Sequence, residues 1–334
     1  MRIGLSFDLK EAISVEPADA DDALEEYDSQ ATIEIISAAL EAKGHSVVRL
    51  GGGSQFLDNV QHGKVDIVFN IAEGRGNYRS REAQVPSILE MLDIPYTGSD
   101  PQCLAVCLDK SIVKKLVTAD GINTPKWLTI PNKEDLCQVS WDGFPFPAII
   151  KPAYEGSSKG IRLTSLAYSA SQVQEEARGI FECYHQPVMV EEFIAGDEVT
   201  VGIIGNSSPE IVGIMRILPK KDSSHFVYSL EVKRDYLNLV EYECPASLGE
   251  QVTDKISVSS LKVFKTLGCR DFARLDFRVS PEGIPFFIEI NPLPGLGTYS
   301  DLIIMSLKMG WTHQALIGRV LDVALERYPR CVPV

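Results

Sequence analysis

Hydrophobic and polar residues follow two alternating periods along the first hundred residues. The runs RIGLSF, HSVVRL and VDIVFNI are short and rich in β-branched residues, which is typical of strands. Residues 31–44 carry apolar side chains at helical spacing and end in Lys-Gly, as helix C-caps often do, and REAQVPSILEMLD predicts a second helix. Strands that alternate with helices indicate an open, mostly parallel sheet.

A turn-rich junction, IPYTGSDP, follows at residues 94–101, and we expect the first domain boundary there. Beyond it the pattern predicts a helix containing CLDKSIVKKLVTADG, the strand FPAIIKP, a glycine-serine loop, the helix SASQVQEEARGIFECY and the strand VMVEEFI. From about residue 192 strands dominate, with EVTVGIIG, EIVGIMRIL and a hairpin. The chain closes with an amphipathic helix, HQALIGRVLDVALERY.

Charge and cysteine content exclude several classes of protein. The 334 residues carry a formal net charge of −14, which argues against general binding to nucleic acid or to an anionic membrane. No segment approaches 18 consecutive apolar residues and the start lacks the apolar stretch of a signal peptide, so we expect a cytoplasmic protein. The seven cysteines are unpatterned, which fits buried thiols in a reducing compartment. Cys103 and Cys107, four residues apart, do not by themselves make a zinc site.

The stretch FARLDFRVSPEGIPFFIEINPLPG, residues 272–295, predicts a β-hairpin with charged groups among apolar ones. With SPEG as a four-residue loop, Val279 pairs with Ile284, and Arg274 stands opposite Glu289 with Asp276 on the diagonal. Alternation then places five side chains on one face: Arg274, Asp276, Phe287, Glu289 and Asn291. Two carboxylates this close repel, and a hard divalent cation such as Mg²⁺ removes the repulsion. The alternative is a structural network in which Arg274 neutralises both carboxylates.

Other segments contain groups that could bind phosphate. FPAIIKP ends in Lys151 and continues into the loop Glu155–Gly160, whose small residues let backbone N–H groups approach phosphate oxygens. The spacing is not that of a P-loop, and a glycine-serine loop is more often an ordinary turn. Lys110 would usually be a solvated helix lysine. Three glutamates around the end of VMVEEFI could likewise be a charged rim: Glu191, Glu192 and Glu198.

Taken together, these segments resemble the D-alanine–D-alanine ligases of the ATP-grasp superfamily over about residues 60–325. The resemblance rests on IPYTGSDP with the following LDK, KPAYEGSSKG, EEFIAGDEVTV, the Glu-x-Lys of LEVK, ECPA, and RLDF through IEINPLPG to Ser300. It implies a mixed α/β and α+β chain, an ATP-grasp fold preceded by a Rossmann-like parallel-sheet domain. The expected domains are 1–98 for substrate, 99–191 as the small ATP-grasp domain, and 192–334 with the metal and catalytic residues.

The resemblance also implies roles for individual residues. Lys110 and Lys151 would contact the phosphates of ATP, with Glu155, Ser157 and Ser158 in the loop that closes over them. Glu191, Glu192 and Ile194 would hold adenine, and Glu198 the ribose hydroxyls. Two Mg²⁺ ions, or Mn²⁺ in their place, would be bound by three residues of the hairpin: Asp276, Glu289 and Asn291.

The reaction implied is activation of a carboxylate as an acyl phosphate, followed by attack of an amine. Lys233 and Arg274 would neutralise charge on the phosphoryl group. Arg274 and the N–H of Gly295 would stabilise the tetrahedral oxyanion, and Ser300 would bind the carboxylate of the attacking substrate. By the same resemblance we expect small amino-acid-like substrates and a homodimer.

The departures from the family pattern lie where the amino acids should bind. The N-terminal motif whose glutamate binds the first D-alanine is absent, and Asp8 or Glu11 would be loose stand-ins. FNIAEGRGNYRSREAQVP offers five charged residues that either recognise an acid or form a solvated loop: Glu73, Arg75, Arg79, Arg81 and Glu82. Arg234 replaces the usual tyrosine and Asp301 the usual apolar residue. These two either pair with each other or contact a polar substrate.

We therefore predict an ATP-dependent carboxylate–amine ligase that forms an amide or peptide bond between two amino-acid-like substrates and releases ADP and phosphate. One alternative is a genuine D-alanine–D-alanine ligase of peptidoglycan synthesis. A lesser alternative is an ATP-binding protein without catalytic activity.

Overall fold

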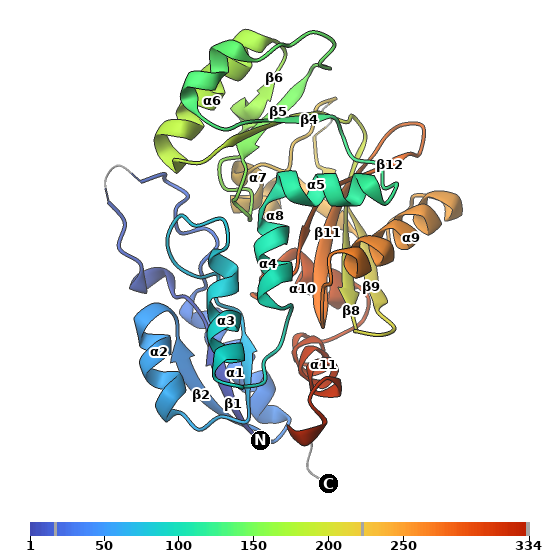
Figure 1. Cartoon of the computed structure of the whole chain (residues 1–334). Helices are drawn as coiled ribbons and strands as arrows, with labels where there is room; N and C mark the ends of the chain where they lie inside the picture. Colours follow the sequence, from blue (N-terminus) through green and yellow to red (C-terminus); the bar gives the residue numbers. More distant parts are fainter. Residues whose placement is uncertain (17–18, 222–223, 332–334) are drawn as a thin grey trace.

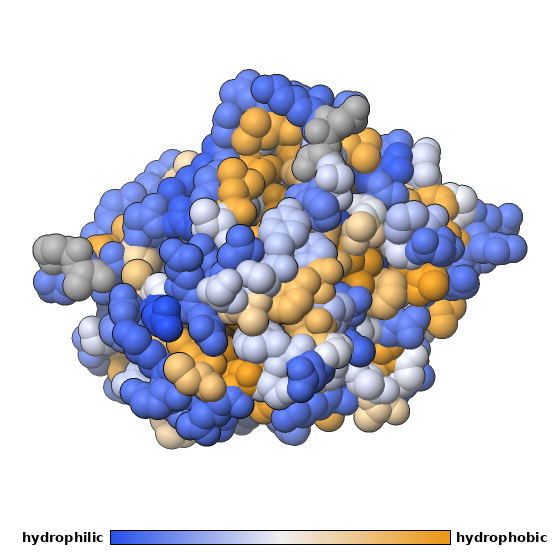
Figure 2. All heavy atoms as spheres, turned by 90° about the horizontal axis from the view of Figure 1, so that it is seen from above, coloured by the Kyte–Doolittle hydropathy of each residue, from blue (hydrophilic) through white to orange (hydrophobic). Residues whose placement is uncertain are grey.

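The computed structural model of the chain describes residues 1–16, 19–221 and 224–331 (Figure 1). Three sheets organise these residues: one parallel and two antiparallel. No helix in these ranges is long and apolar enough to cross a membrane. Seen from above the small upper lobe, hydrophobic residues are scattered in separate patches among hydrophilic ones (Figure 2).

The first sheet confirms the predicted parallel arrangement, with strand order β2-β1-β3. Its strands are β1 (Arg2–Ser6), β2 (Ser46–Gly51) and β3 (Ile67–Asn70), and its helices are α1 (Gln30–Ala42), α2 (Gly53–His62) and α3 (Gln84–Met91). The Ser29 side chain caps α1 by accepting from the N–H of Thr32. Gly44 follows α1 with a φ of +84°, a conformation that glycine adopts at helix C-termini without strain.

The second sheet is antiparallel, with order β4-β7-β5-β6. Its strands are β4 (Trp127–Ile130), β5 (Ala148–Pro152), β6 (Leu166–Ala167) and β7 (Val188–Glu192), and α6 (Ala170–Tyr184) covers it (Figure 1). The helix predicted around CLDKSIVKKLVTADG is two helices, α4 (Pro101–Leu108) and α5 (Lys110–Ala119). They separate at Asp109, whose extended backbone ends α4. The Asp109 carboxylate accepts hydrogen bonds from the backbone N–H groups of Ser111 and Ile112 at the start of α5.

The third sheet has five antiparallel strands in the order β10-β9-β8-β11-β12. Its strands are β8 (Asp197–Ile204), β9 (Glu210–Pro219), β10 (Val240–Glu243), β11 (Phe272–Val279) and β12 (Pro285–Asn291). The helices of this part are α7 (Leu230–Arg234), α8 (Tyr236–Leu239), α9 (Glu250–Thr266), α10 (Asp301–Lys308) and α11 (His313–Glu326). Short 3₁₀ helices elsewhere span Lys10–Ala12, Arg81–Ala83, Lys133–Gln138, Leu163–Ser165 and Pro329–Cys331.

The closing helix α11 packs against the first sheet's helix α1, although the two are far apart in sequence (Figure 1). Leu316, Ile317 and Val320 of α11 are fully buried in one core with Ile33 and Ile36 of α1. The predicted last domain, 192–334, therefore shares its core with the first. The N-terminal and C-terminal parts of the chain are therefore packed together through α1 and α11.

Candidate active site

The hairpin of β11 and β12 carries the charged residues predicted for a metal site. Asp276 lies directly opposite Glu289, and Arg274 lies opposite Asn291. The predicted register, with Arg274 opposite Glu289 and Val279 opposite Ile284, is therefore wrong. Two features cause the difference. The loop between the strands spans five residues, 280–284, so Val279 pairs with Pro285, and a β-bulge after Asp276 adds one extra residue in β12 and shifts the remaining pairs once more.

The bulge also changes the face to which Phe287 belongs. Phe287 packs in the core against Phe277, with ring centroids 5.8 Å apart, and does not share the face of the charged residues as predicted. Ile288 takes a place in the pocket wall instead. The other four predicted residues line the two pockets described below: Arg274, Asp276, Glu289 and Asn291.

Each of the two carboxylates of the hairpin has its own basic partner. Arg274 Nη2 lies 2.9 Å from Asp276 Oδ2, and Lys110 Nζ lies 3.4 Å from Glu289 Oε2. Burial alone would raise the pKa of Glu289, but the positive charges of Lys110, Lys151 and Arg274 outweigh it and lower the pKa to about 2. Glu289 is therefore ionised at neutral pH and is available as an anionic ligand.

These hairpin residues fit the donor set of a magnesium ion. The Asp276 and Glu289 side chains are 18% and 23% exposed, so their oxygens reach the pocket and are not sealed in the core. The Asn291 side-chain oxygen accepts from the N–H of Leu293 at 2.8 Å, which fixes its orientation and leaves a second lone pair. Two carboxylates and an amide oxygen are hard ligands of the kind that Mg²⁺ prefers.

Two lysines meet one glutamate at the inner end of the second sheet. Lys151, at the end of β5, and Lys114, in α5, both place Nζ 2.5 Å from the carboxylate of Glu191. All three side chains are almost completely buried. Burial lowers the pKa of Lys114 to about 8 although Glu191 opposes this, whereas the pKa of Lys151 is raised by Glu191 and Glu289. Lys151 is therefore positively charged at neutral pH, and it lines the pocket described next.

A pocket of about 780 Å³, part of it open to solvent, lies between the second and third sheets. It brings together ten of the predicted residues: Lys151, Ser158, Glu191, Glu192, Ile194, Glu198, Lys233, Asp276, Glu289 and Asp301. Arg278 organises the outer end, because it donates to Ile194 O at 2.8 Å and pairs with Glu198 at 2.7 Å. Its guanidinium also stacks over Phe193, 4.6 Å from the ring centroid.

The glycine-serine loop lies against the N-terminal part of the chain. Gly156 N–H donates to Glu26 at 2.6 Å, and Gly160 N–H donates to Asp22 at 2.9 Å. Ser157 and Ser158 have φ values of +50° and +62°, a conformation that non-glycine residues adopt only where their surroundings hold them. The Glu155 carboxylate turns away from the pocket and pairs with other residues, while its backbone carbonyl accepts from Lys110.

A second pocket of about 1210 Å³, also partly open, adjoins the first and shares Tyr228, Lys233 and Asp301 with it. Seven more of the predicted residues line it: Glu73, Ser157, Arg234, Arg274, Asn291, Gly295 and Ser300. A Cβ atom on Gly295 would stand 3.0 Å from Ser300 Oγ, so a side chain there would crowd the pocket. The two pockets meet at Tyr228, Lys233 and Asp301.

The D-ala D-ala ligase C-terminus family model matches residues 116–322 of the chain. A D-alanine–D-alanine ligase of Aquifex aeolicus is 36% identical over 286 residues, which are 86% of this chain and 92% of the relative. The chain belongs to the D-alanine–D-alanine ligase family. An uncharacterized protein of Sinorhizobium fredii is also similar, at 32% identity over 88% of this chain and 87% of that protein.

Solved structures of the family have the same fold. The D-alanine–D-alanine ligase from Bacillus anthracis, determined in complex with ATP, gives a TM-score of 0.75 at 24% identity and covers 99% of both chains. The predicted ATP-grasp fold is confirmed, and so is the predicted enzyme class, an ATP-dependent ligase that forms C–N bonds.

The residues that depart from the ligase family pattern lie in different environments. Arg234 and Asp301 do not pair with each other: Arg234 lies 2.6 Å from Glu25, and Asp301 lies 3.7 Å from Arg274 and accepts from Tyr228 at 3.1 Å. Arg81 does not line either pocket but is buried in ion pairs with Glu26 and Glu155. Glu73 lines the second pocket.

Neither of the two N-terminal residues expected as stand-ins, Asp8 and Glu11, lines the first or the second pocket. Asp8 is buried and pairs with Arg75 at 2.9 Å, and it accepts from the N–H of Gly74 at 2.9 Å. Glu11 is exposed in a 3₁₀ helix. A different acid, Asp28, lines the second pocket instead.

Sequence reasoning missed several residues that line or support the ligase site. Lys114 stands one helical turn after Lys110, and that spacing on an amphipathic helix was an available signal. Arg278 follows Arg274 and Asp276 at strand alternation in β11, which was also a signal. Tyr242 lies on β10. No comparable signal marks the others, which come from segments without periodicity: Glu25, Glu26, Asp28, Tyr228 and Tyr299.

Proposed function

We propose that this protein is an ATP-dependent D-alanine–D-alanine ligase. The observation that carries the proposal is the group of charges at the first pocket, where Asp276 faces Glu289 with Lys110 and Lys151 beside them. The sequence left D-alanine–D-alanine ligation and ligation of another amino-acid pair open. Curated relatives that cover most of this chain favour the first.

The first pocket suits ATP in shape and chemistry. Its outer part has apolar walls for the flat adenine ring: Ile149, Ile194, Val199, Ile217 and Ile288. Its inner part ends in Lys151, the hairpin carboxylates and the serine loop, which suit the phosphates. Asp276, Glu289 and Asn291 would hold Mg²⁺. Bound there, the ion would neutralise charge on the phosphates.

The chain's own groups supply position and charge for the reaction. A carboxylate resists attack by an amine because its leaving group would be oxide, so the γ-phosphoryl group is first transferred to a carboxylate oxygen with release of ADP. The amine then attacks the carbonyl carbon, loses a proton, and phosphate departs as the C–N bond is completed. Arg274 and the Gly295 N–H face the developing oxyanion, and Lys233 at the junction of both pockets faces the phosphoryl group.

Two acids of the second pocket have no partner of their own. Neither the Asp28 nor the Glu73 side chain makes a hydrogen bond or ion pair with another residue in the described part of the chain, although both line the pocket. Burial and the neighbouring Asp8 raise the pKa of Asp28 to about 7, and burial raises that of Glu73 well above its usual range. A substrate ammonium group would supply the missing charge, so we assign these acids to the amino group of the acid-donating substrate.

One observation favours a second candidate, ligation of an amino acid with a polar side chain as the amine. Asp301 and Tyr228 line both pockets beside Ser300, and Tyr228 OH lies 2.7 Å from Tyr242 OH. A site built from such groups rejects an analogue that leaves them unpaired.

The test is an ADP-release assay with D-alanine alone and then with a library of D- and L-amino acids in pairs, followed by mass spectrometry of the product. The proposal expects D-alanyl-D-alanine at the highest kcat/KM. Preference for a pair with a serine-like or charged amine would support the second candidate. ATP binding without turnover on any pair would contradict both.

A further inference from the structure

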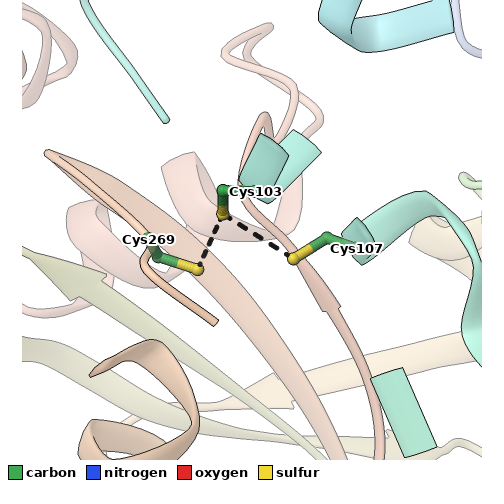
Figure 3. Close-up of side chains that lie close together, drawn as sticks. All are labelled: Cys103, Cys107 and Cys269. Carbon is green, nitrogen blue, oxygen red and sulfur yellow. Dashed lines mark hydrogen bonds between the residues drawn. The ribbon is translucent and has the colours of Figure 1, made fainter. Parts of the chain in front are cut away.

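Three cysteines from two distant parts of the chain meet below the hairpin (Figure 3). Cys103 Sγ lies 3.8 Å from Cys107 Sγ, one turn further along α4, and 3.6 Å from Cys269 Sγ, just before β11. Their three sulfur atoms all lie within 4.8 Å of one another. Within the described ranges, no other trio of His, Cys, Asp or Glu side chains brings its ligand atoms this close.

The sulfur atoms lie mainly among apolar side chains, with the Ser99 hydroxyl and the Asp100 carboxylate near Cys103. Cys103, Cys107 and Cys269 are 2%, 6% and 7% exposed and belong to the core between the third sheet and helices α5 and α9. The hydrogen bond with Cys103 and burial hold the pKa of the Cys107 and Cys269 thiols well above the usual range, so these two are protonated at neutral pH. A net charge on the cluster would be costly, since no Lys, Arg or His side chain of the described residues hydrogen-bonds its sulfur atoms.

The charge balance decides which element suits this site. Three thiolates with a monovalent ion would carry a net charge of −2, and with zinc, which also seeks a fourth ligand, a net charge of −1. Three thiolates with a trivalent ion carry no net charge. We propose that Cys103, Cys107 and Cys269 form a binding site for a trivalent thiophilic element, for which arsenic(III) is the probe.

The reaction of the probe needs no oxidant or reductant. Arsenous acid, As(OH)₃, exchanges its three hydroxyl groups for three thiolates: three As–O bonds break and three As–S bonds form. The three thiol protons leave with the hydroxyl groups as three water molecules, and arsenic stays trivalent. The buried product carries no charge.

Binding of arsenic to the three cysteines would affect the pocket that we propose for ATP. Cys107 lines a small pocket together with Lys110, Glu289 and Asn291. Only Leu108 and Asp109 separate Cys107 from Lys110, which begins α5. Drawing Cys107 toward Cys269 would therefore displace Lys110 from Glu289. Loss of ATP binding is the expected consequence, and this part alone rests on the proposed function.

The experiment incubates the reduced full-length protein with arsenite and measures X-ray absorption at the arsenic edge and native mass. We expect one arsenic per chain, a mass gain of one arsenic less three protons, and three sulfur neighbours with no oxygen. Because the cluster is buried, binding should be slow. Two sulfurs and one oxygen around arsenic, or tighter binding of zinc than of arsenite, would overturn the proposal.

Two variants separate the cluster from the other four cysteines. A chain in which Cys137, Cys183, Cys244 and Cys331 are changed to serine should bind arsenite as the wild type does. Cys269→Ala should weaken binding by at least about tenfold. Equal affinity of Cys269→Ala and wild type would show that the buried thiols are only packing atoms. The wild-type absorption spectrum decides the matter even where a variant folds poorly. Ligase activity is not needed for either readout, so failure of this proposal is distinct from failure of the proposed function.

Discussion

The two pockets differ in how their charges are arranged. We call the first pocket, proposed for ATP, the nucleotide end and the second pocket, proposed for the amino acids, the amino-acid end. At the nucleotide end, acidic side chains have a basic partner within reach: Glu191 with Lys151, Glu198 with Arg278, Asp276 with Arg274 and Glu289 with Lys110. These groups stand on strands or at helix starts. At the amino-acid end, loops contribute most of the wall, and Asp28 and Glu73 line the pocket without an ion-pair partner among the described residues.

This difference separates the chemistry from the choice of substrate. Paired charges on rigid strands hold a fixed geometry, which suits the phosphoryl transfer common to a family. Unpaired buried acids are costly until a ligand brings the opposite charge, so they favour substrates that carry it. Substrate preference can therefore change at the amino-acid end without disturbing the nucleotide end.

Removal of a negative charge from the nucleotide end should have the largest effect on activity. Glu289→Gln or Asp276→Asn should lower kcat by about 10²–10³, because each loses an electrostatic contact made in the phosphoryl-transfer step. The matched control is Glu282→Gln, at the exposed tip of the same hairpin, which should retain activity and the same circular dichroism spectrum. Normal turnover in a soluble Glu289→Gln protein would remove the metal assignment.

Glu26 lines the second pocket and contacts the glycine-serine loop of the first, so its substitution should have the next largest effect on activity and stability. Its buried carboxylate lies 2.7 Å from Arg81 and 3.3 Å from Lys159 and accepts from Gly156 N–H. Glu26→Gln should lower the free energy of unfolding by about 2 kcal/mol and raise KM for ATP, because it loosens the serine loop. Chemical denaturation measures the first and ADP release the second.

The pH dependence of the same group provides a control. Arg81 and Lys159 outweigh the effect of burial and lower the pKa of Glu26 to about 2. Its stabilisation is therefore present above about pH 4.5 and is lost as the pH falls toward 2. The neighbouring Glu25→Gln, which affects a more exposed pair with Arg234, should change stability much less. Equal effects of the two variants would contradict the role given to Glu26.

Asp301→Leu tests whether the amino-acid end recognises a polar group on the amine substrate. If Asp301 contacts a polar group of the amine substrate, the change should lower kcat/KM for the native pair by at least about tenfold, some 1.4 kcal/mol, and shift preference toward apolar amino acids. Asp301→Asn keeps an acceptor for Tyr228 and serves as the control. An unchanged ranking of substrates would make Asp301 a structural partner of Arg274.

The smallest expected effect is a few-fold change at Asp28, visible in the pH profile. Its pKa is raised from 3.8 to about 7, mainly by burial and then by Asp8, with Lys10 opposing them. As the pH rises through about 7, Asp28 ionises, so kcat/KM for the acid-donating substrate should rise. Asp28→Asn should remove that rise.

Stability should change in the opposite direction to substrate use at Asp28. A raised folded pKa favours folding below pH 3.8 and loses this contribution as the pH rises to about 7. The Asn variant should therefore gain thermal stability relative to wild type at pH 8 but not at pH 4. A pH profile with the same shape in both proteins would exclude Asp28 from substrate binding.

The same division explains how much could be predicted from the sequence. Residues of the nucleotide end lie on strands with clear alternation and in short motifs, so the sequence could single out Lys151, Glu191 and Asp276, which the structure brings together in one pocket. The predicted register of the hairpin is wrong because the loop is one residue longer than expected and because a β-bulge then reverses the alternation in β12. Such a bulge leaves no mark in composition.

Helix α9 and the loop residues show the other limits. The pattern after residue 192 predicted mainly strands, although Ile256, Val263 and Phe264 of α9 are buried at helical spacing. The β-branched and serine-rich character of EQVTDKISVSSLKVFKT obscured that spacing. Glu26 and Asp28 lie in a segment without periodicity, and only the packing of distant parts of the chain brings them to the site.

The central claim, that the nucleotide end phosphorylates a substrate carboxylate, is tested most directly with ¹⁸O. D-alanine labelled in its carboxylate is incubated with ATP and the enzyme, and the released phosphate is examined by ³¹P NMR or mass spectrometry. We predict ADP and phosphate in equal amounts, with one ¹⁸O atom of the carboxylate transferred to each phosphate. Release of AMP and pyrophosphate, or phosphate without ¹⁸O alongside amide formation, would contradict the account.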